Sequence, residues 1–275
     1  MTNLKQTLTL FCVAWILASC STLKKMPSSA EMQAINDSIV AEGFQLYYSE
    51  RAHWIATDIM LEKCNMANVG GGVTYKPDAN TLAVVFFDRN NKNCVLEYRA
   101  STLNREASVI DSIRPISEEE MALWHRNSSL IEKAISKYGD KMLFASKSFG
   151  SPNLDIIEIN DHLIRIYFLQ GTVKPDLIPF GNDYSIDFDE NLEPVAFRKY
   201  HNSLIAIPTK DSGEEVRMTV HSHLPDNPFI TPTDICNFLL YRPADMDSFS
   251  VLSTSYNCMF TFSLDQQLIL IEKRK

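Results

Sequence analysis

The stretch from residue 216 to residue 241 constrains the fold most, because it joins an expected strand to a proline-containing loop and a helix start. Along a β-strand, residues two apart point to the same face. His221 and His223 can therefore direct both imidazoles at one ion, and neutral imidazoles are good zinc ligands. The opposite face is then expected to pack in the core through Val216, Met218 and Val220.

A third ligand can come from the start of the following helix. Thr231 suits the N-cap, Pro232 suits the first helical position, and Asp234 falls in the first turn. The Asp234 carboxylate can turn back towards the imidazoles and complete a site of two histidines and one aspartate. Two other interpretations stay open: Thr-x-x-Asp is an ordinary capping signal, and the histidines can be a core pair with backbone partners.

The same residues resemble the signature of the JAMM (Mov34/JAB1/MPN-type) metalloproteases, which is His-x-His, seven residues, Ser, two residues and Asp. Here His221-Ser222-His223 is followed by seven residues, then Thr231, two residues and Asp234. The spacing is identical, and threonine keeps the hydroxyl of the family's serine. The resemblance extends over about residues 155–275 and is sharp over residues 216–241.

The resemblance implies that one zinc ion binds His221, His223 and Asp234 and polarises a water that attacks an amide carbonyl, while Thr231 helps to stabilise the oxyanion. The family takes its proton-handling glutamate from just before an apolar strand that ends in glycine. Residues 164–171 have that shape but begin with isoleucine, so Glu158 is the acid assigned to this role. The implied activity is that of a zinc-dependent peptidase or isopeptidase acting on a peptide or protein. The alternative is an inactive JAMM-like binding or scaffold module.

The first twenty residues predict export. An apolar run over residues 8–17 follows Lys5 and is too short to span a bilayer. It ends in Leu17-Ala18-Ser19-Cys20, which resembles the lipobox of bacterial lipoproteins. We therefore expect a signal peptide over residues 1–19, lipid on Cys20, a tether over residues 20–30 and a membrane-anchored protein of the cell envelope. Ser21 favours the outer membrane.

The remaining chain is expected to form two regions, residues 31–150 and a JAMM-like domain over residues 151–275. A net charge of −8 argues against nucleic acid as a partner. Disulfides and buried free thiols are both compatible with the four cysteines that follow residue 30, namely Cys64, Cys94, Cys236 and Cys258.

Periodicity and turn residues predict an α+β fold, with a mixed, mostly antiparallel sheet and flanking helices in the C-terminal half and a helix and hairpin in the N-terminal half. Helices are expected over residues 31–63, from Ser117 to about Gly139, and over residues 232–241. The triple glycine at residues 70–72 is expected to form a turn. Strands are expected at residues 82–87, 95–98, 163–169, 184–188, 204–207, 216–220, 249–253, 259–264 and 268–272.

Overall fold

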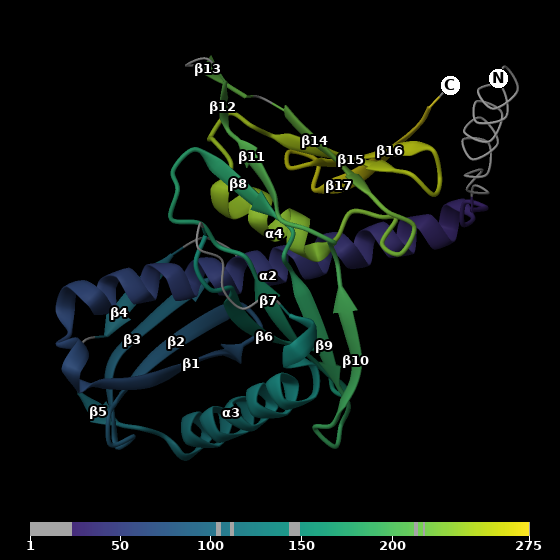
Figure 1. The fold of residues 1–275 in the computed structure, drawn as a ribbon. Helices are drawn as coiled ribbons and strands as arrows, with labels where there is room; N and C mark the ends of the chain where they lie inside the picture. The colour runs from purple at the N-terminus through teal and green to yellow at the C-terminus, as the bar shows by residue number, and fades with distance from the viewer. Residues whose placement is uncertain are drawn as a thin grey trace, which may run out of the picture.

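The computed structural model describes residues 24–102, 106–110, 113–142, 149–211, 214–216 and 218–274. Within these residues the chain is an α+β protein with three α-helices and mostly antiparallel sheets (Figure 1). The helices are α2 (Ser29–Lys63), α3 (Glu118–Tyr138) and α4 (Pro232–Tyr241). All three were expected, and the expected mixed, mostly antiparallel α+β class is confirmed.

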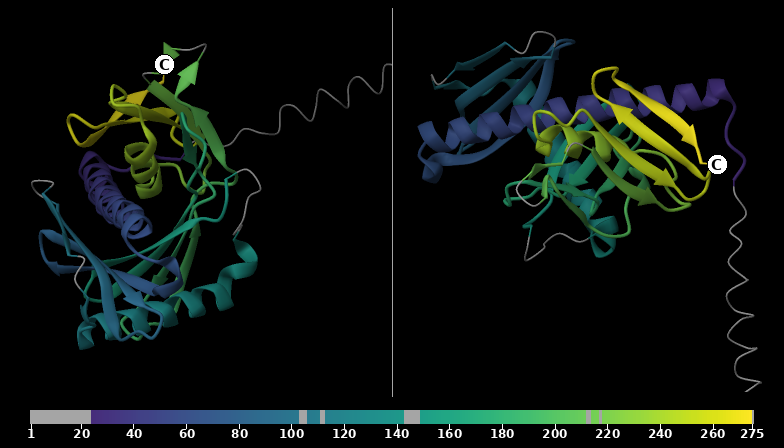
Figure 2. Two further views of the ribbon diagram at one scale, coloured as in Figure 1. Left: turned by 90° about the vertical axis from the view of Figure 1, so that its left-hand side faces the viewer. Right: turned by 90° about the horizontal axis from the view of Figure 1, so that it is seen from above.

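Helix α2 is the central element of the fold, and a capping box of Ser28 and Glu31 starts it. Its first half packs through Met32 on the core beneath the C-terminal sheet, and its second half packs through Ala56 on the N-terminal sheet. Figure 2 shows the helix running past both parts of the molecule. One helix therefore contributes to the cores of both halves of the chain.

The N-terminal sheet is buried on both faces, because α2 covers one face and α3 the other. Two-sided burial explains why its second strand reads as a continuous apolar run. The strands follow the order β1-β2-β3-β4, and β5 also pairs with β3. They are β1 (Val69–Asp78), β2 (Thr81–Asp88), β3 (Asn93–Ser101), β4 (Ala107–Ile110) and β5 (Arg114–Pro115).

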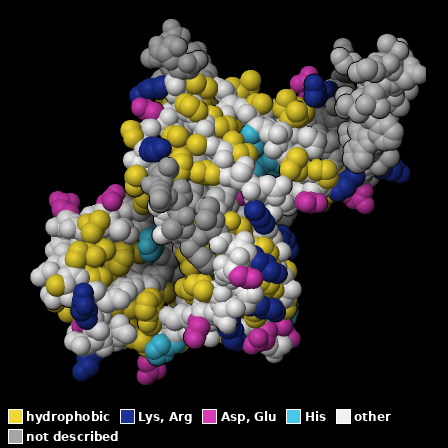
Figure 3. All heavy atoms as spheres, in the orientation of Figure 1, with side chains coloured by type: hydrophobic (Ala, Val, Ile, Leu, Met, Phe, Trp, Pro, Cys, Tyr) yellow, Lys and Arg dark blue, Asp and Glu magenta, His cyan; other side chains and the backbone are white. Residues whose placement is uncertain are grey.

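The prediction of a turn at residues 70–72 is wrong, since the three glycines lie within β1. A Cβ on Gly71 would lie 2.5 Å from the ring of Trp124 on α3, and one on Gly72 would lie 2.8 Å from the carbonyl oxygen of Val85. These glycines permit close packing of a helix and a neighbouring strand on β1. A hollow lies beside this sheet (Figure 3), where residues of α2, β1, α3 and β6 line a cavity of about 270 Å³.

The second half of the chain contains two four-stranded sheets, ordered β10-β9-β7-β6 and β14-β15-β16-β17, and a two-stranded sheet of β8 and β11. The first is formed by β6 (Asn153–Asn160), β7 (Leu163–Leu169), β9 (Tyr184–Phe188) and β10 (Pro194–Lys199). The others contain β8 (Leu177–Phe180), β11 (Ile205–Pro208), β14 (Met218–His223), β15 (Ser248–Ser253), β16 (Cys258–Ser263) and β17 (Leu268–Lys273). A short hairpin, β12 (Lys210–Asp211) and β13 (Glu214–Glu215), lies between β11 and β14.

Strands β14 and β15 form the parallel pair among the described strands, and α4 lies in the connection between them. A parallel pair needs such a crossover. On the other side of α4, Gly43 of α2 meets Ile235, where a Cβ on Gly43 would lie 2.8 Å from the Ile235 Cβ. Helix α4 is thus held between the sheet and α2, which fixes the position of its first turn.

The predicted orientation of β14 is wrong. Met218 and Val220 are 60% and 50% exposed, whereas His221 and His223 face the interior. The two histidines have odd numbers, whereas Met218 and Val220 have even numbers. The two pairs therefore point to opposite faces of the strand, and one pair must face outwards. The imidazoles lie inside because polar partners surround them there, as described below. Val216 does pack against the core, as expected.

No disulfide joins the four cysteines of the described part, Cys64, Cys94, Cys236 and Cys258, and the last three are buried. The sequence is compatible with disulfides and with buried thiols, and the structure has thiols in this part of the chain. The structure also adds strands that the periodicity did not predict, among them β6, β8 and β10.

Two buried carboxylates, Glu50 on α2 and Asp155 on β6, make stability depend on pH. Each is 7% exposed. Burial, reinforced by the negative charge of Asp155, raises the pKa of Glu50 to about 8, and burial raises the pKa of Asp155 to about 7. The pKa of Glu50 in the folded chain lies above its ordinary value of 4.5. The contribution of the protonated carboxyl to the stability of the fold is therefore complete below pH 4.5 and is lost as the pH rises towards 8.

Glu50→Gln is therefore expected to stabilise the protein at pH 9 by about 2–4 kcal/mol relative to wild type and to have a smaller effect at pH 5. Urea unfolding at both pH values measures the difference. Glu62→Gln, at an exposed position of the same helix, is the matched control and should leave the pH dependence unchanged. Equal stabilities of wild type and Glu50→Gln at pH 9 would contradict this account.

Candidate metal centre

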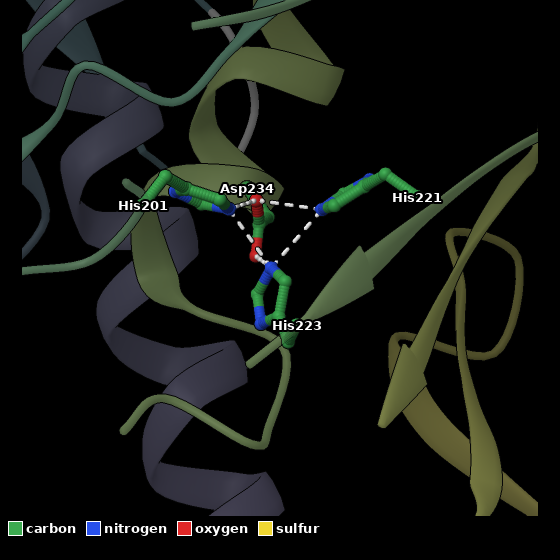
Figure 4. A group of neighbouring side chains, drawn as sticks. All are labelled: His201, His221, His223 and Asp234. Carbon is green, nitrogen blue, oxygen red and sulfur yellow. Dashed lines mark hydrogen bonds and ion pairs between the residues drawn. The ribbon is translucent and has the colours of Figure 1, made fainter. Parts of the chain in front are cut away.

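Four side chains from three parts of the chain converge in the interior (Figure 4). His221 and His223 come from β14, Asp234 comes from the first turn of α4, and His201 comes from the segment that follows β10. Their exposed fractions are 6%, 2%, 1% and 5%, respectively. The structure thus brings together the three predicted ligands and adds a fourth group that the sequence did not predict.

The donor atoms of these side chains lie at the separations of a tetrahedral metal site. Nε2 of His223 is 2.8 Å from Nε2 of His201 and 3.1 Å from Nε2 of His221. Oδ1 of Asp234 is 3.2 Å from Nε2 of His201 and 3.4 Å from Nε2 of His221. A tetrahedral zinc ion with bonds of 2.0–2.1 Å has ligand-to-ligand edges of about 3.3 Å.

Hydrogen bonds at the far side of two rings direct nitrogen lone pairs into the cluster. Nδ1 of His223 lies 2.6 Å from the carbonyl oxygen of Phe229, and Nδ1 of His201 lies 2.8 Å from Oδ1 of Asp183. Both oxygens accept, so each Nδ1 donates, and the Nε2 of a neutral ring then carries a lone pair. The two Nε2 atoms are 2.8 Å apart, so their lone pairs repel each other unless a cation, either a proton or a metal ion, lies between them.

The carboxylate of Asp234 serves both the helix cap and the cluster, and Oδ2, which accepts the capping bonds, also lies 3.5 Å from Nε2 of His223. Oδ2 accepts hydrogen bonds from the backbone N–H and the hydroxyl of Thr231, both at 2.8 Å. Oδ1 lies towards His201 and His221, and no other group in the described ranges donates a hydrogen bond to it. The capping interpretation is therefore correct but incomplete, because the capping bonds also hold the carboxylate in place for the imidazoles.

Asp183 and Thr233 form a second layer around the site. Asp183 orients His201, and the Thr233 hydroxyl in the first turn of α4 donates to Asp183. Carboxylates that accept from the distal nitrogen of a histidine are typical partners of metal-binding imidazoles. His221 has no such partner among the described residues, since its buried Nδ1 is unpaired there.

The charges of the cluster indicate where a proton resides without metal. Burial acts to lower the pKa of His201, but the carboxylates of Asp183 and Asp234 outweigh burial and hold this pKa well above 6.5. Burial lowers the pKa of His223 to about 4, against the attraction of Asp234. Burial acts to raise the pKa of Asp234, but His201 and His223 hold it well below 3.8. The metal-free cluster therefore keeps one proton on His201 at neutral pH.

A metal ion must displace this proton, so binding is expected to release about one proton per ion at pH 7, and affinity should fall about tenfold per pH unit on acidification. Titration calorimetry in two buffers of different ionisation enthalpy measures the release. An apparent binding enthalpy that is the same in both buffers would contradict the assignment.

Other predicted site residues lie elsewhere or take a different part. Glu158 is exposed on β6 and pairs with Arg126 at 2.6 Å, so it is not part of the cluster. Thr231 makes the capping bonds described above. Cys20 and the expected signal peptide lie outside the described residues. No helix in the described part of the chain is long and apolar enough to cross a membrane.

The site borders a cavity of about 210 Å³ that is lined by His201 and His223 together with residues such as Asn202, Ser222 and Asp226. This cavity is the side from which an ion could enter. His201 and Asp183 carried no spacing signal in the sequence, because they precede the His-x-His pair by about 20 and 40 residues on separate segments. The one available hint concerned Asp183, which directly precedes the strand expected at residues 184–188; His201 follows β10, which the sequence did not predict.

Comparison of the chain with protein-family models, with curated proteins and with solved structures found no match. The resemblance to JAMM metalloproteases therefore rests on the spacing of His221, His223, Thr231 and Asp234 alone. What defines the site is its own geometry, that of a buried group of three imidazoles and one carboxylate able to hold a metal ion.

Proposed function

We propose that this chain is a lipid-anchored envelope protein built around one structural metal ion, zinc by preference, and that it acts as a binding or scaffold module. The observation that carries the proposal is the convergence of four buried donors, three Nε2 atoms and one carboxylate oxygen, on one point. Four protein ligands are typical of structural zinc sites, whereas catalytic sites have three and leave a position for water. Nitrogen and oxygen donors at tetrahedral separations favour zinc over ions that prefer octahedral or planar sites.

The ion would join three segments that the chain brings together from a distance. His201 follows the sheet that contains β10, His221 and His223 belong to the next sheet, and Asp234 begins the helix between β14 and β15. The ion would also neutralise the repulsion between the lone pairs of His201 and His223. Its role would thus be to fix the junction of these elements.

Hydrolysis of an amide bond, in the manner of JAMM metalloproteases, is the second candidate, and the cavity beside His201 and His223 favours it. Hydrolysis requires a coordination position for water. The ion offers this position only if it accepts a fifth ligand or if His201 leaves it. Hydrolysis also requires a base, and in the described part of the chain the acid nearest to the cluster besides Asp234 is Asp183, which is bound to His201 and Thr233. These requirements make the structural role the better supported of the two.

The test combines metal content with activity on the full chain. We expect one zinc ion per chain after purification without chelators, and no cleavage of a mixed peptide library above the level of a His223→Ala variant. Zinc at much less than one ion per chain, not restored by added zinc, would contradict the metal centre. Cleavage that zinc supports and that His223→Ala abolishes would replace the scaffold role by the hydrolase.

A further inference from the structure

The outer face of the sheet β14–β17 carries a group of exposed apolar side chains among polar ones. Its inner face packs on α2 and α4 through Phe249, Phe260 and Phe262. On the outer face, Val220 of β14 and Leu270 of β17 are 50% and 48% exposed and lie at the two edges of one row of the register. Ser250 and Thr261 lie between them in that row and are hydrogen-bonded to each other. Leu252 and Met259 are paired in the next row, and both are half-buried. Exposed apolar side chains gathered on one face of a sheet are typical of an interaction site.

The described chain begins at one end of this sheet. The backbone N–H of Lys24 donates to the carbonyl oxygen of Ser255, between β15 and β16, at 2.9 Å. The Lys24 ammonium donates to the carbonyl oxygen of Pro225, just after β14, at 2.8 Å. These two bonds fix the start of the chain beside the row that contains Leu252 and Met259. Leu224, which precedes Pro225, is 49% exposed at the same end.

Basic residues gather at this end. The N–H of Arg274 donates to the carbonyl oxygen of Asn257, in the turn that also contains Ser255. The N–H of Lys24 bonds to Ser255 of the same turn, so the two ends of the described chain meet at this turn. Lys24, Lys25, Lys273 and Arg274 are therefore neighbours in space, and two acids, Asp226 and Glu272, lie in the same region. Arg274, Lys273, Glu272 and Met259 line a shallow pocket there.

We propose that this outer face docks on the bilayer that holds the lipid of Cys20, with Leu224, Leu252, Met259 and Leu270 against the lipid and the four basic residues at the level of the phosphate groups. The inference rests on the proposed lipid anchor. Three residues separate Cys20 from Lys24, and an extended chain spans at most about 3.6 Å per residue, so this end of the sheet lies within about 15 Å of the anchored cysteine. Such a short tether permits an exposed apolar face with basic neighbours to meet anionic lipid.

The docking also gives the metal centre a role. His223 is the last residue of β14, and the cavity beside it is lined by Leu224 and Asp226 at the tethered end. A metal ion that fixes the end of β14 would therefore fix the docking face as well.

The test uses the full chain, purified with its lipid and inserted in vesicles of equal parts phosphatidylethanolamine and phosphatidylglycerol. An environment-sensitive fluorophore is attached at Leu270→Cys or Val220→Cys, with Ile135→Cys on α3, which is 44% exposed, as the matched control. All three variants carry Cys64→Ser, because the other described cysteines are buried. Circular dichroism checks that the labelled chains are folded.

We expect the emission of the probes at residues 270 and 220 to shift to the blue and to gain intensity at least twofold on vesicles, and the probe at residue 135 to stay unchanged. Equal emission at all three positions in an acylated protein would overturn the docking and leave the lipid anchor intact. A mass spectrum without acyl chains on Cys20 would overturn the anchor and the docking together. The two failures are thus distinguished by the mass of the N-terminal peptide.

Discussion

Removal of the bound ion is expected to lower the melting temperature of the protein by about 8–16 °C. An ion that binds the folded chain at a free concentration of about 1,000 times Kd contributes about 4 kcal/mol. In a domain of this size, each kcal/mol corresponds to about 2–4 °C. The physical reason is that the ion joins β14, α4 and the segment of His201, and that the metal-free cluster retains only a proton between its donors.

Thermal scans of the zinc-loaded protein with and without a chelator measure this effect. Asp234→Asn is the matched control, because its amide oxygen can still accept the capping bonds of Thr231 while the anionic ligand is lost. The chelator should leave the melting temperature of this variant unchanged. A wild-type melting temperature that is insensitive to the chelator would show that no ion stabilises the fold.

Replacement of a zinc ligand is expected to weaken zinc binding far more than replacement of Asp183, which orients the ligand His201. Structural zinc sites bind with about 10–16 kcal/mol, so one of four ligands corresponds to about 3–4 kcal/mol. His223→Ala and His201→Ala should thus each lower the affinity by about 10²–10³-fold. Asp183→Asn, which removes the charge that orients His201, should lower it by about 10–100-fold.

Competition with a chromophoric chelator measures these affinities. Ser222→Ala is the matched control, because this exposed residue lies between the two histidines on the opposite face of β14. It should bind zinc like the wild type. An unchanged affinity in His201→Ala would exclude His201 from the site and leave the three-ligand arrangement that the sequence predicted.

Local signals in the sequence predicted much of the secondary structure. The capping boxes at Ser117 and Thr231 placed the starts of α3 and α4 correctly, and short runs rich in apolar residues placed β7 and β9 at their observed bounds. These signals depend on residues within a few positions of each other. The His-x-His pair and Asp234 were predicted in the same local way, because a single strand, loop and helix start connect them.

Features that depend on contacts between residues far apart in the sequence could not be predicted from such local signals. His201 reaches the cluster because the segment after β10 runs beside the end of β14 and the loop that follows it, and no spacing encodes that contact. Hydrophobicity predicts that Met218 and Val220 of β14 face the core, whereas the polar partners of the imidazoles bury His221 and His223 instead. The glycine pattern of β1 predicts a turn, because the groups that require glycine lie elsewhere in the chain: Trp124 packs on Gly71, and the carbonyl oxygen of Val85 lies against Gly72.

The most direct test of the metal centre is zinc X-ray absorption of the purified protein. We expect a first shell of four nitrogen or oxygen atoms at about 2.0–2.1 Å, with outer-shell scattering from three imidazoles. A shell of five or six oxygen atoms, or outer scattering from fewer than three imidazoles, would contradict the convergence of His201, His221, His223 and Asp234 on one ion.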